Sequence, residues 1–140
     1  MSIIDELLSF GDLPRWVSSS LSLVIKDFGD VTYDFYLEYL TLDQKNPENN
    51  NGSAVFLTSE EIIKAYFTLD LITIEKRKLS KTIKVLKRVY TSTEDIFRDQ
   101  DIKYTSVDLK FIGNEDISLV CPVVTSNYNL EKYQNLISKL

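Results

Sequence analysis

The most regular alternation of apolar and polar residues runs from Val31 to Tyr39, where every second residue is aliphatic or aromatic. A period of two is typical of a half-buried β-strand, so we expect a strand here. The preceding run, residues 21–25, also alternates and leads into the turn sequence DFGD of residues 27–30. Together the two runs predict a β-hairpin. A helix over residues 15–25 is the alternative, because apolar residues there also recur every three or four positions.

Further strands are expected in the middle and the second half of the chain. Residues 54–57 form a short apolar strand candidate, and residues 69–74 fit either a strand or the continuation of a helix. Residues 103–112 alternate again and lead into the turn sequence GNED of residues 113–116, which predicts a second hairpin. Its return strand, residues 117–124, is almost continuously apolar, so we expect it to be buried on both faces.

Three segments carry the signals of helix ends together with a helical spacing of apolar residues. Residues 2–11 begin with a capping serine and end with a glycine, so they predict a short helix. Residues 58–67 begin with a capping box, in which Thr58 and Glu61 stand three positions apart. Residues 129–140 place leucine, isoleucine and tyrosine on one stripe and predict a C-terminal helix.

The segment from Lys76 to Arg88 holds seven of the 16 basic residues and no acid. On a helix that ends near Tyr90, its apolar residues form one stripe and most of its cations form the opposite face, so we expect an amphipathic basic helix. The rest of the chain holds 9 basic and 21 acidic groups, a net charge of −12. Two interpretations remain open. The basic face either binds an acidic partner or is a solvated surface whose lysine stems cover apolar groups.

Together these elements predict a single α+β domain over residues 1–140, with about five short, mainly antiparallel strands and three to four helices. The polar residues 43–53 are expected to form a flexible loop. The single cysteine, Cys121, lies in an apolar run, so we expect an inert, buried thiol and no intramolecular disulfide. The N-terminus is acidic, unlike a signal peptide, and no run is long enough to span a membrane, which favours a cytoplasmic protein.

The residue types leave few routes to catalysis. Histidine is absent, which excludes catalytic triads and zinc sites that depend on it. Four scattered glycines form neither of the common nucleotide-binding loops. The acids within residues 94–101 could hold a cation, and Asp34 with Glu38 could act as an acid–base pair. Neither set has a diagnostic spacing, so we expect no enzyme, cofactor, metal or small-molecule substrate, while a carboxylate-based activity stays open.

The uneven charge makes protein binding the favoured function. We expect a non-enzymatic subunit of a larger assembly, such as a phage or virus particle or a similar machine, that contacts a partner protein or copies of itself. The alternative is a small acidic inhibitor of the immunity, antitoxin or anti-defence kind that blocks a basic site on a toxin or nuclease. We expect neither a nucleic acid nor a membrane as partner. The candidate partner-binding residues are Lys76, Arg77, Lys81, Lys84, Lys87, Arg88, Asp34 and Glu38.

Overall fold

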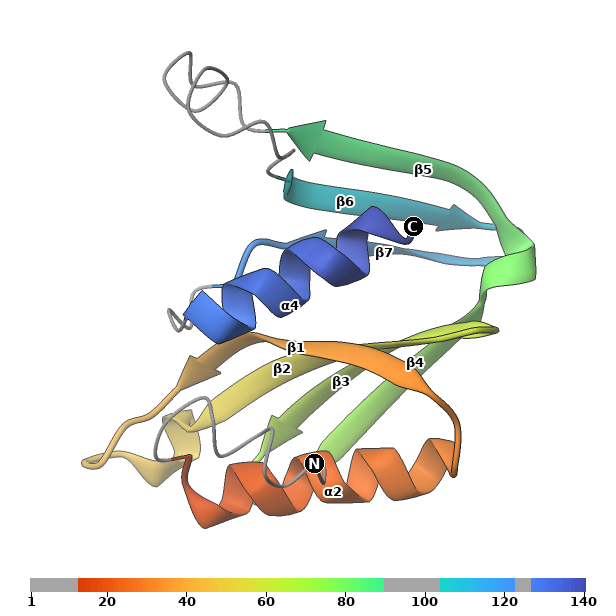
Figure 1. Cartoon of the computed structure of the whole chain (residues 1–140). Helices are drawn as coiled ribbons and strands as arrows, with labels where there is room; N and C mark the ends of the chain where they lie inside the picture. Colours follow the sequence, from red (N-terminus) through yellow and green to blue (C-terminus); the bar gives the residue numbers. More distant parts are fainter. Residues whose placement is uncertain (1–12, 90–103, 123–126) are drawn as a thin grey trace.

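Four antiparallel strands form the middle layer of the fold, seen here in a computed structural model that describes residues 13–89, 104–122 and 127–140 (Figure 1). The described residues form two helices and seven antiparallel strands, which confirms the predicted α+β class with more strands than expected. Sheet A has the strand order β1-β2-β3-β4 and sheet B the order β5-β6-β7. The elements are α2 (Arg15–Phe28), β1 (Tyr33–Thr41), β2 (Asn51–Thr58), β3 (Glu61–Thr68), β4 (Ile72–Lys78), β5 (Thr82–Val89), β6 (Tyr104–Phe111), β7 (Asn114–Val120), α4 (Asn127–Ser138) and short 3₁₀ turns at Pro47–Asn49 and Leu79–Lys81.

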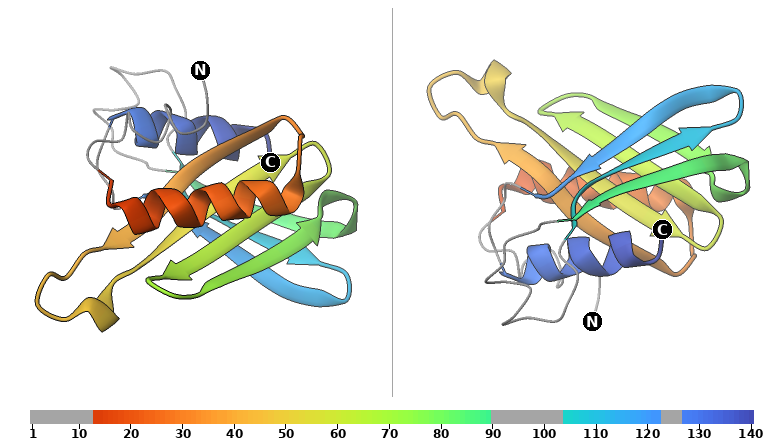
Figure 2. Two further views of the ribbon diagram at one scale, coloured as in Figure 1. Left: turned by 90° about the horizontal axis from the view of Figure 1, so that it is seen from below. Right: turned by 90° about the horizontal axis from the view of Figure 1, so that it is seen from above.

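Helix α2 packs against one face of sheet A (Figures 1 and 2). Its residues Val17, Leu21 and Val24 are fully buried and contact the aromatic layer of the sheet, which includes Phe56. The strand predicted for residues 21–25 is therefore wrong, and the helical alternative is confirmed. Burial here follows a spacing of three and four residues, which is the period of a helix and not of a strand.

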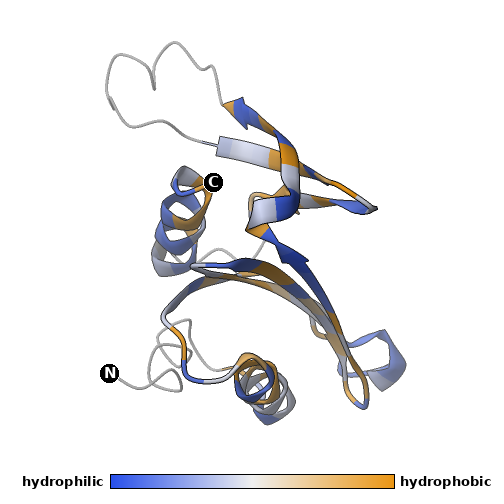
Figure 3. Cartoon of the chain, turned by 90° about the vertical axis from the view of Figure 1, so that its right-hand side faces the viewer, coloured by the Kyte–Doolittle hydropathy of each residue, from blue (hydrophilic) through white to orange (hydrophobic). Residues whose placement is uncertain are grey.

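Sheet B and helix α4 cover the opposite face of sheet A, so that the fold has α2 on one side and α4 with sheet B on the other (Figure 3). The predicted C-terminal helix is confirmed, and three residues of its apolar stripe are fully buried. The buried residues of this second core are Tyr36, Val55, Leu57, Ile62, Val107, Leu109, Phe111, Ile117, Leu119, Tyr133, Leu136 and Ile137.

The helix predicted for residues 58–67 is wrong, because this segment forms a tight turn followed by strand β3. The Thr58 hydroxyl does accept the N–H groups of Glu60 and Glu61, at 3.3 and 3.0 Å, as a capping residue would. Strand β3, however, lies between two apolar layers and is buried on both faces. A strand of this kind loses its alternation and cannot be distinguished from a buried helix by sequence pattern.

The basic helix predicted for residues 76–90 is also wrong. Its first residues end β4, a 3₁₀ turn redirects the chain, and the remainder forms β5 of the other sheet (Figure 1). Both strands are edges of their sheets, and edge strands commonly carry charged side chains. The cations therefore fall on both faces of each strand, which hides the alternation and imitates a helical period.

The remaining strand predictions are mostly confirmed. The alternating runs form β1 and β6, the residues 54–57 lie within β2, and residues 72–74 belong to β4. The second hairpin is also confirmed, since β6 pairs with β7 across Gly113, whose φ of +74° suits a turn glycine. The prediction that the return strand is buried on both faces is wrong: β7 buries Ile117 and Leu119 on one face only.

The polar loop predicted for residues 43–53 is shorter than expected, because β2 already begins at Asn51. The Asp43 carboxylate organises the loop by accepting the N–H groups of Lys45 and Asn46, at 2.9 and 3.0 Å. These bonds hold the pKa of Asp43 below its usual value. The helix predicted for residues 2–11 and the acidic cluster predicted within residues 94–101 lie outside the described residues.

Candidate protein-interaction surface

Strand β5 exposes large apolar side chains at an open edge of sheet B. Ile83, Val85, Leu86 and Val89 are 62%, 40%, 42% and 44% exposed. The strand pairs with β6 on one side, and no described strand pairs with it on the other (Figure 1). We call the unpaired side of Thr82–Val89 the β5 edge. An exposed apolar edge is a surface on which another chain can pair.

The edge of sheet A at β1 is closed in the middle by helix α4. The side-chain amide of Asn129 accepts the N–H of Leu37 at 2.9 Å and donates to its carbonyl oxygen at 2.8 Å. This buried contact lies where a bulge between Leu37 and Tyr39 interrupts the pairing of β1 with β2. An asparagine thus supplies the hydrogen bonds that a neighbouring strand would otherwise give.

The edge of sheet B at β7 is closed by a buried ion pair. The Lys64 ammonium lies 3.0 Å from a carboxylate oxygen of Glu38, and both side chains are at most one-tenth exposed. Lys64 also donates to the carbonyl oxygen of Ser118 at 2.8 Å, and Glu38 accepts the N–H of Val120 at 3.2 Å. The Ser53 hydroxyl adds a bond to Glu38. This inter-sheet ion pair therefore satisfies two outward main-chain groups of β7, the Ser118 carbonyl and the Val120 N–H, and joins the two sheets.

Burial and the charge of Glu38 shift the pKa values of several ionisable groups near the inter-sheet ion pair. Burial opposes the charge of Lys64, but the Glu38 carboxylate outweighs this effect and raises the pKa of Lys64 above its usual value. Burial, together with the charge of Glu38, raises the pKa of Tyr36 well above its ordinary range. Burial likewise raises the pKa of the Cys121 thiol, which is half-buried and not fully buried as predicted.

Positive charge accompanies the apolar side chains of β5. Arg88 is paired with Asp108 of β6 at 2.8 Å. The Lys87 ammonium lies 5.0 Å from the centre of the Tyr104 ring, and Lys84 is exposed without an ion pair among the described residues. The β5 edge thus presents two lysines that an acidic partner can neutralise.

The other predicted basic residues serve different purposes. Lys76 forms an ion pair of 2.6 Å with Asp27, which joins β4 to the end of α2. Arg77 donates to the carbonyl oxygen of Glu115 at 3.3 Å and so reaches across to the β6–β7 hairpin. Lys81 is exposed in the 3₁₀ turn that leads into β5. Only Lys81 therefore adds to the charge of the β5 edge.

The two predicted acidic residues do not form a common exposed surface. Asp34 is bound by the ammonium of Lys139 at 2.7 Å, close to the end of α4. Glu38 is 2% exposed and belongs to the inter-sheet ion pair. Each carboxylate is thus engaged by a lysine of its own.

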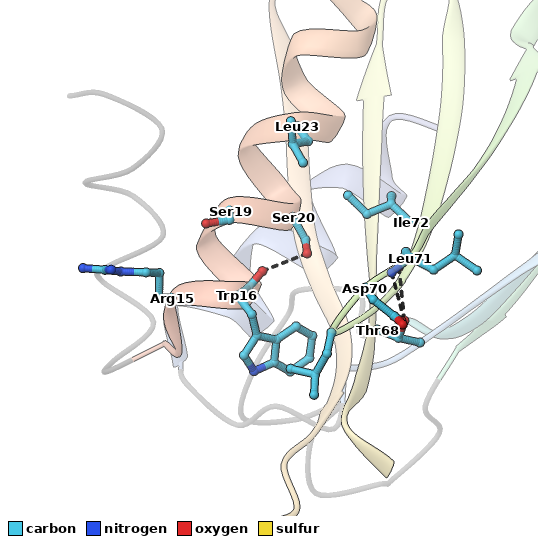
Figure 4. A pocket seen from close by; sticks show the side chains of 10 residues that line it. Arg15, Trp16, Ser19, Ser20, Leu23, Thr68, Asp70, Leu71 and Ile72 are labelled. Carbon is cyan, nitrogen blue, oxygen red and sulfur yellow. Dashed lines mark hydrogen bonds between the residues drawn. The ribbon is translucent and has the colours of Figure 1, made fainter. Parts of the chain in front are cut away.

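A pocket with a volume of about 610 Å³ lies between α2 and the β3–β4 turn (Figure 4). Trp16 and Leu71 supply apolar lining, and the Trp16 ring packs edge-on against Phe67 at 5.8 Å. Two of its hydroxyl groups are bonded within the fold, since Ser20 donates to its own helix and Thr68 accepts the N–H of Leu71. Arg15, Ser19 and Asp70 add polar and charged groups to the lining of this pocket.

Within residues 13–89, 104–122 and 127–140, no three metal-ligating side chains gather into a cluster. Neither described helix has the length and apolar content needed to cross a membrane. No protein-family model, curated protein or solved structure matches the chain. The function must therefore be argued from the surface itself.

Sequence reasoning located the basic segment but missed what accompanies it. The apolar residues Ile83, Val85 and Leu86 were expected to be a buried stripe, whereas they are exposed on β5. The role of Lys64 was also missed, although one signal was available. A single lysine within the apolar run of residues 62–67 must find a buried partner if that run is covered on both faces.

Proposed function

We propose that this protein is a non-enzymatic binding subunit that holds an acidic region of a partner protein on the β5 edge. The carrying observation is that Ile83, Val85 and Leu86 are exposed beside Lys84 and Lys87 on a strand with one unpaired side. Apolar groups supply contact area, and unneutralised cations select an acidic partner and speed its approach. A place in a larger assembly in the cytoplasm is part of this proposal.

The contrast between the edges supports this assignment. The β1 and β7 edges are occupied by Asn129 and by the inter-sheet ion pair, so these strands cannot readily accept another chain. On β4, Ile72 and Ile74 pack toward the α2 core. Strand β5 combines an unpaired side with apolar side chains that remain accessible.

The inhibitor alternative receives less support from the geometry. It requires acidic side chains that are available to a basic site on a toxin or nuclease. Asp34 is paired with Lys139, and Glu38 is buried with Lys64. Two of the carboxylates on which that alternative depends are thus engaged within the molecule, whereas Glu48 of the polar loop is exposed.

A random library of twelve-residue displayed peptides tests the proposal without requiring that the partner be identified. We expect the wild-type protein to enrich acidic peptides, and a Lys84→Glu/Lys87→Glu variant to lose that enrichment. The matched control is Lys26→Glu/Lys45→Glu, which reverses two exposed lysines away from β5 and changes the net charge from −5 to −9 in the same way. Enrichment that ignores peptide charge, or that both variants lose equally, would refute the proposal.

A further inference from the structure

The directions of the main-chain hydrogen bonds in sheet B can be followed from its β7 edge. Ser118 and Val120 direct main-chain groups away from β6, toward the inter-sheet ion pair. The next residue, Cys121, donates its N–H to the carbonyl oxygen of Thr105 at 3.0 Å. Successive residues of an antiparallel strand point alternately to the two sides. Residues 105, 107 and 109 of β6 therefore bond to β7, and residues 106 and 108 bond to β5.

This alternation identifies the open groups of β5. Arg88 and Leu86 stand opposite residues 106 and 108, so their main-chain groups are used in the pairing with β6. Val85 and Lys87 then direct one N–H and one carbonyl oxygen each out of the sheet. No described strand or side chain bonds to these groups. These four main-chain groups are available to pair with an additional β-strand.

The side chains on both faces of β5 indicate what an added strand should carry. Val85 lies opposite the buried Leu109, so it extends the second core beyond the part that is covered. An apolar side chain on an added strand would continue this layer. On the outer face, Leu86 is flanked by Lys84, which has no acidic partner among the described residues. An added strand that alternates apolar and acidic residues would match these positions.

A second copy of β5 fits this edge poorly. The two-fold antiparallel register that pairs the open groups of Val85 with those of Lys87 in the other copy is centred on Leu86. That register sets Lys84 of one copy opposite Arg88 of the other, and does so twice. Like charges directly opposite each other destabilise a strand pair. In this register Lys84 and Arg88 therefore oppose pairing between copies, whereas Lys84 favours an acidic strand.

From these observations we infer that β5 binds an extended, acidic segment of a partner protein as an additional strand of sheet B. The inference rests on the proposed function and makes it specific. Main-chain bonds to Val85 and Lys87 supply the pairing, and Lys84, on the outer face beside Leu86, selects acidic side chains on that face of the added strand. Partners that use a folded acidic surface without adding a strand belong to the broader proposal alone.

The test uses a capped ten-residue peptide of alternating glutamate and valine, with an alternating lysine and valine peptide as control. Two further versions carry N-methyl groups on all glutamates or on all valines, which removes the N–H groups along one side of the peptide. We expect the acidic peptide to bind, and one methylated version to bind at least tenfold more weakly than the other. We also expect the amide hydrogens of Val85 and Lys87 to exchange more slowly in the complex. A Val85→Pro variant, which removes an outward N–H, should lower the affinity at least tenfold.

The possible failures separate the two proposals. If the acidic peptide binds in a salt-dependent manner, yet both methylated versions bind equally and the β5 amides gain no protection, strand addition is overturned and the broader proposal stands. If neither peptide binds, strand addition is overturned, and if the acidic and basic peptides bind equally, both proposals are overturned. The exchange measurement uses the wild-type protein, so the test does not depend on the folding of the proline variant.

Discussion

Removing the Lys64 ammonium should strongly destabilise the fold, because it leaves the Glu38 carboxylate buried without its counterion. In a Lys64→Met variant the side-chain volume is nearly kept, but the 3.0 Å ion pair and the 2.8 Å bond to the Ser118 carbonyl are lost. Breaking a buried pair by removing one partner costs about 3–5 kcal/mol. Total stabilities are only about 5–15 kcal/mol, so the loss is a large share of the whole.

A double variant separates the lost attraction from the stranded charge. In Glu38→Gln/Lys64→Met no charge is left in the cluster, and replacing a whole buried pair is often close to neutral. We therefore expect the double variant to be more stable than Lys64→Met, with a coupling between the sites of about 1–3 kcal/mol.

Denaturant unfolding followed by the fluorescence of Trp16, the single tryptophan, measures these differences. The indole packs against Phe67 in the α2 core, so its signal should report loss of tertiary packing. A cost of less than about 1 kcal/mol for Lys64→Met would contradict the role given to the pair. So would a double variant whose cost equals the sum of the two single costs.

Three further changes test the packing. Asn129→Ala should lower the free energy of unfolding by about 2 kcal/mol in a urea titration, because both buried main-chain groups of Leu37 lose their partner; no measurable loss would show that α4 does not close this edge. Gly52→Ala should cost about 1–3 kcal/mol by the same titration, because its Cβ would lie 2.6 Å from the confined Phe67 ring, and an unchanged midpoint would contradict that crowding. Tyr36→Phe should leave thermal stability unchanged or raise it, because the buried hydroxyl has no hydrogen-bond partner among the described residues; a lower melting temperature would indicate that this hydroxyl does form a stabilising bond.

Sequence pattern could predict the strands that have one solvent-exposed face and one buried face. Strand β6 is of this kind, with Val107 and Leu109 buried between more exposed residues, and its alternation was visible. Strand β3 is buried on both faces, so most of its residues are apolar without alternation, and this apolar run was predicted to be a helix. The basic segment failed for the opposite reason. The two edge strands that it forms are largely exposed to solvent. Without a fully buried face, their charged residues do not alternate with apolar ones.

The positive charge of the candidate surface could be predicted from the sequence, but its secondary structure and side-chain contacts could not. Composition alone singled out residues 76–88 as the basic part of an acidic chain. It could not indicate that Lys76 pairs with Asp27 while Lys84 stays exposed, because such contacts depend on how the sheets pack. The closure of two edges by Asn129 and Lys64 was equally hidden, since each acts on strands distant in sequence.

The most direct test of the β5 edge is a titration of ¹⁵N-labelled protein with the alternating glutamate and valine peptide, followed by the shifts of individual amide resonances. We predict that the largest changes cluster on β5, at Val85 and Lys87 above all, and that they disappear in the Lys84→Glu/Lys87→Glu variant. Changes that centre on the Trp16 pocket, or that spread evenly over the molecule, would contradict the central claim that β5 is the protein-binding edge.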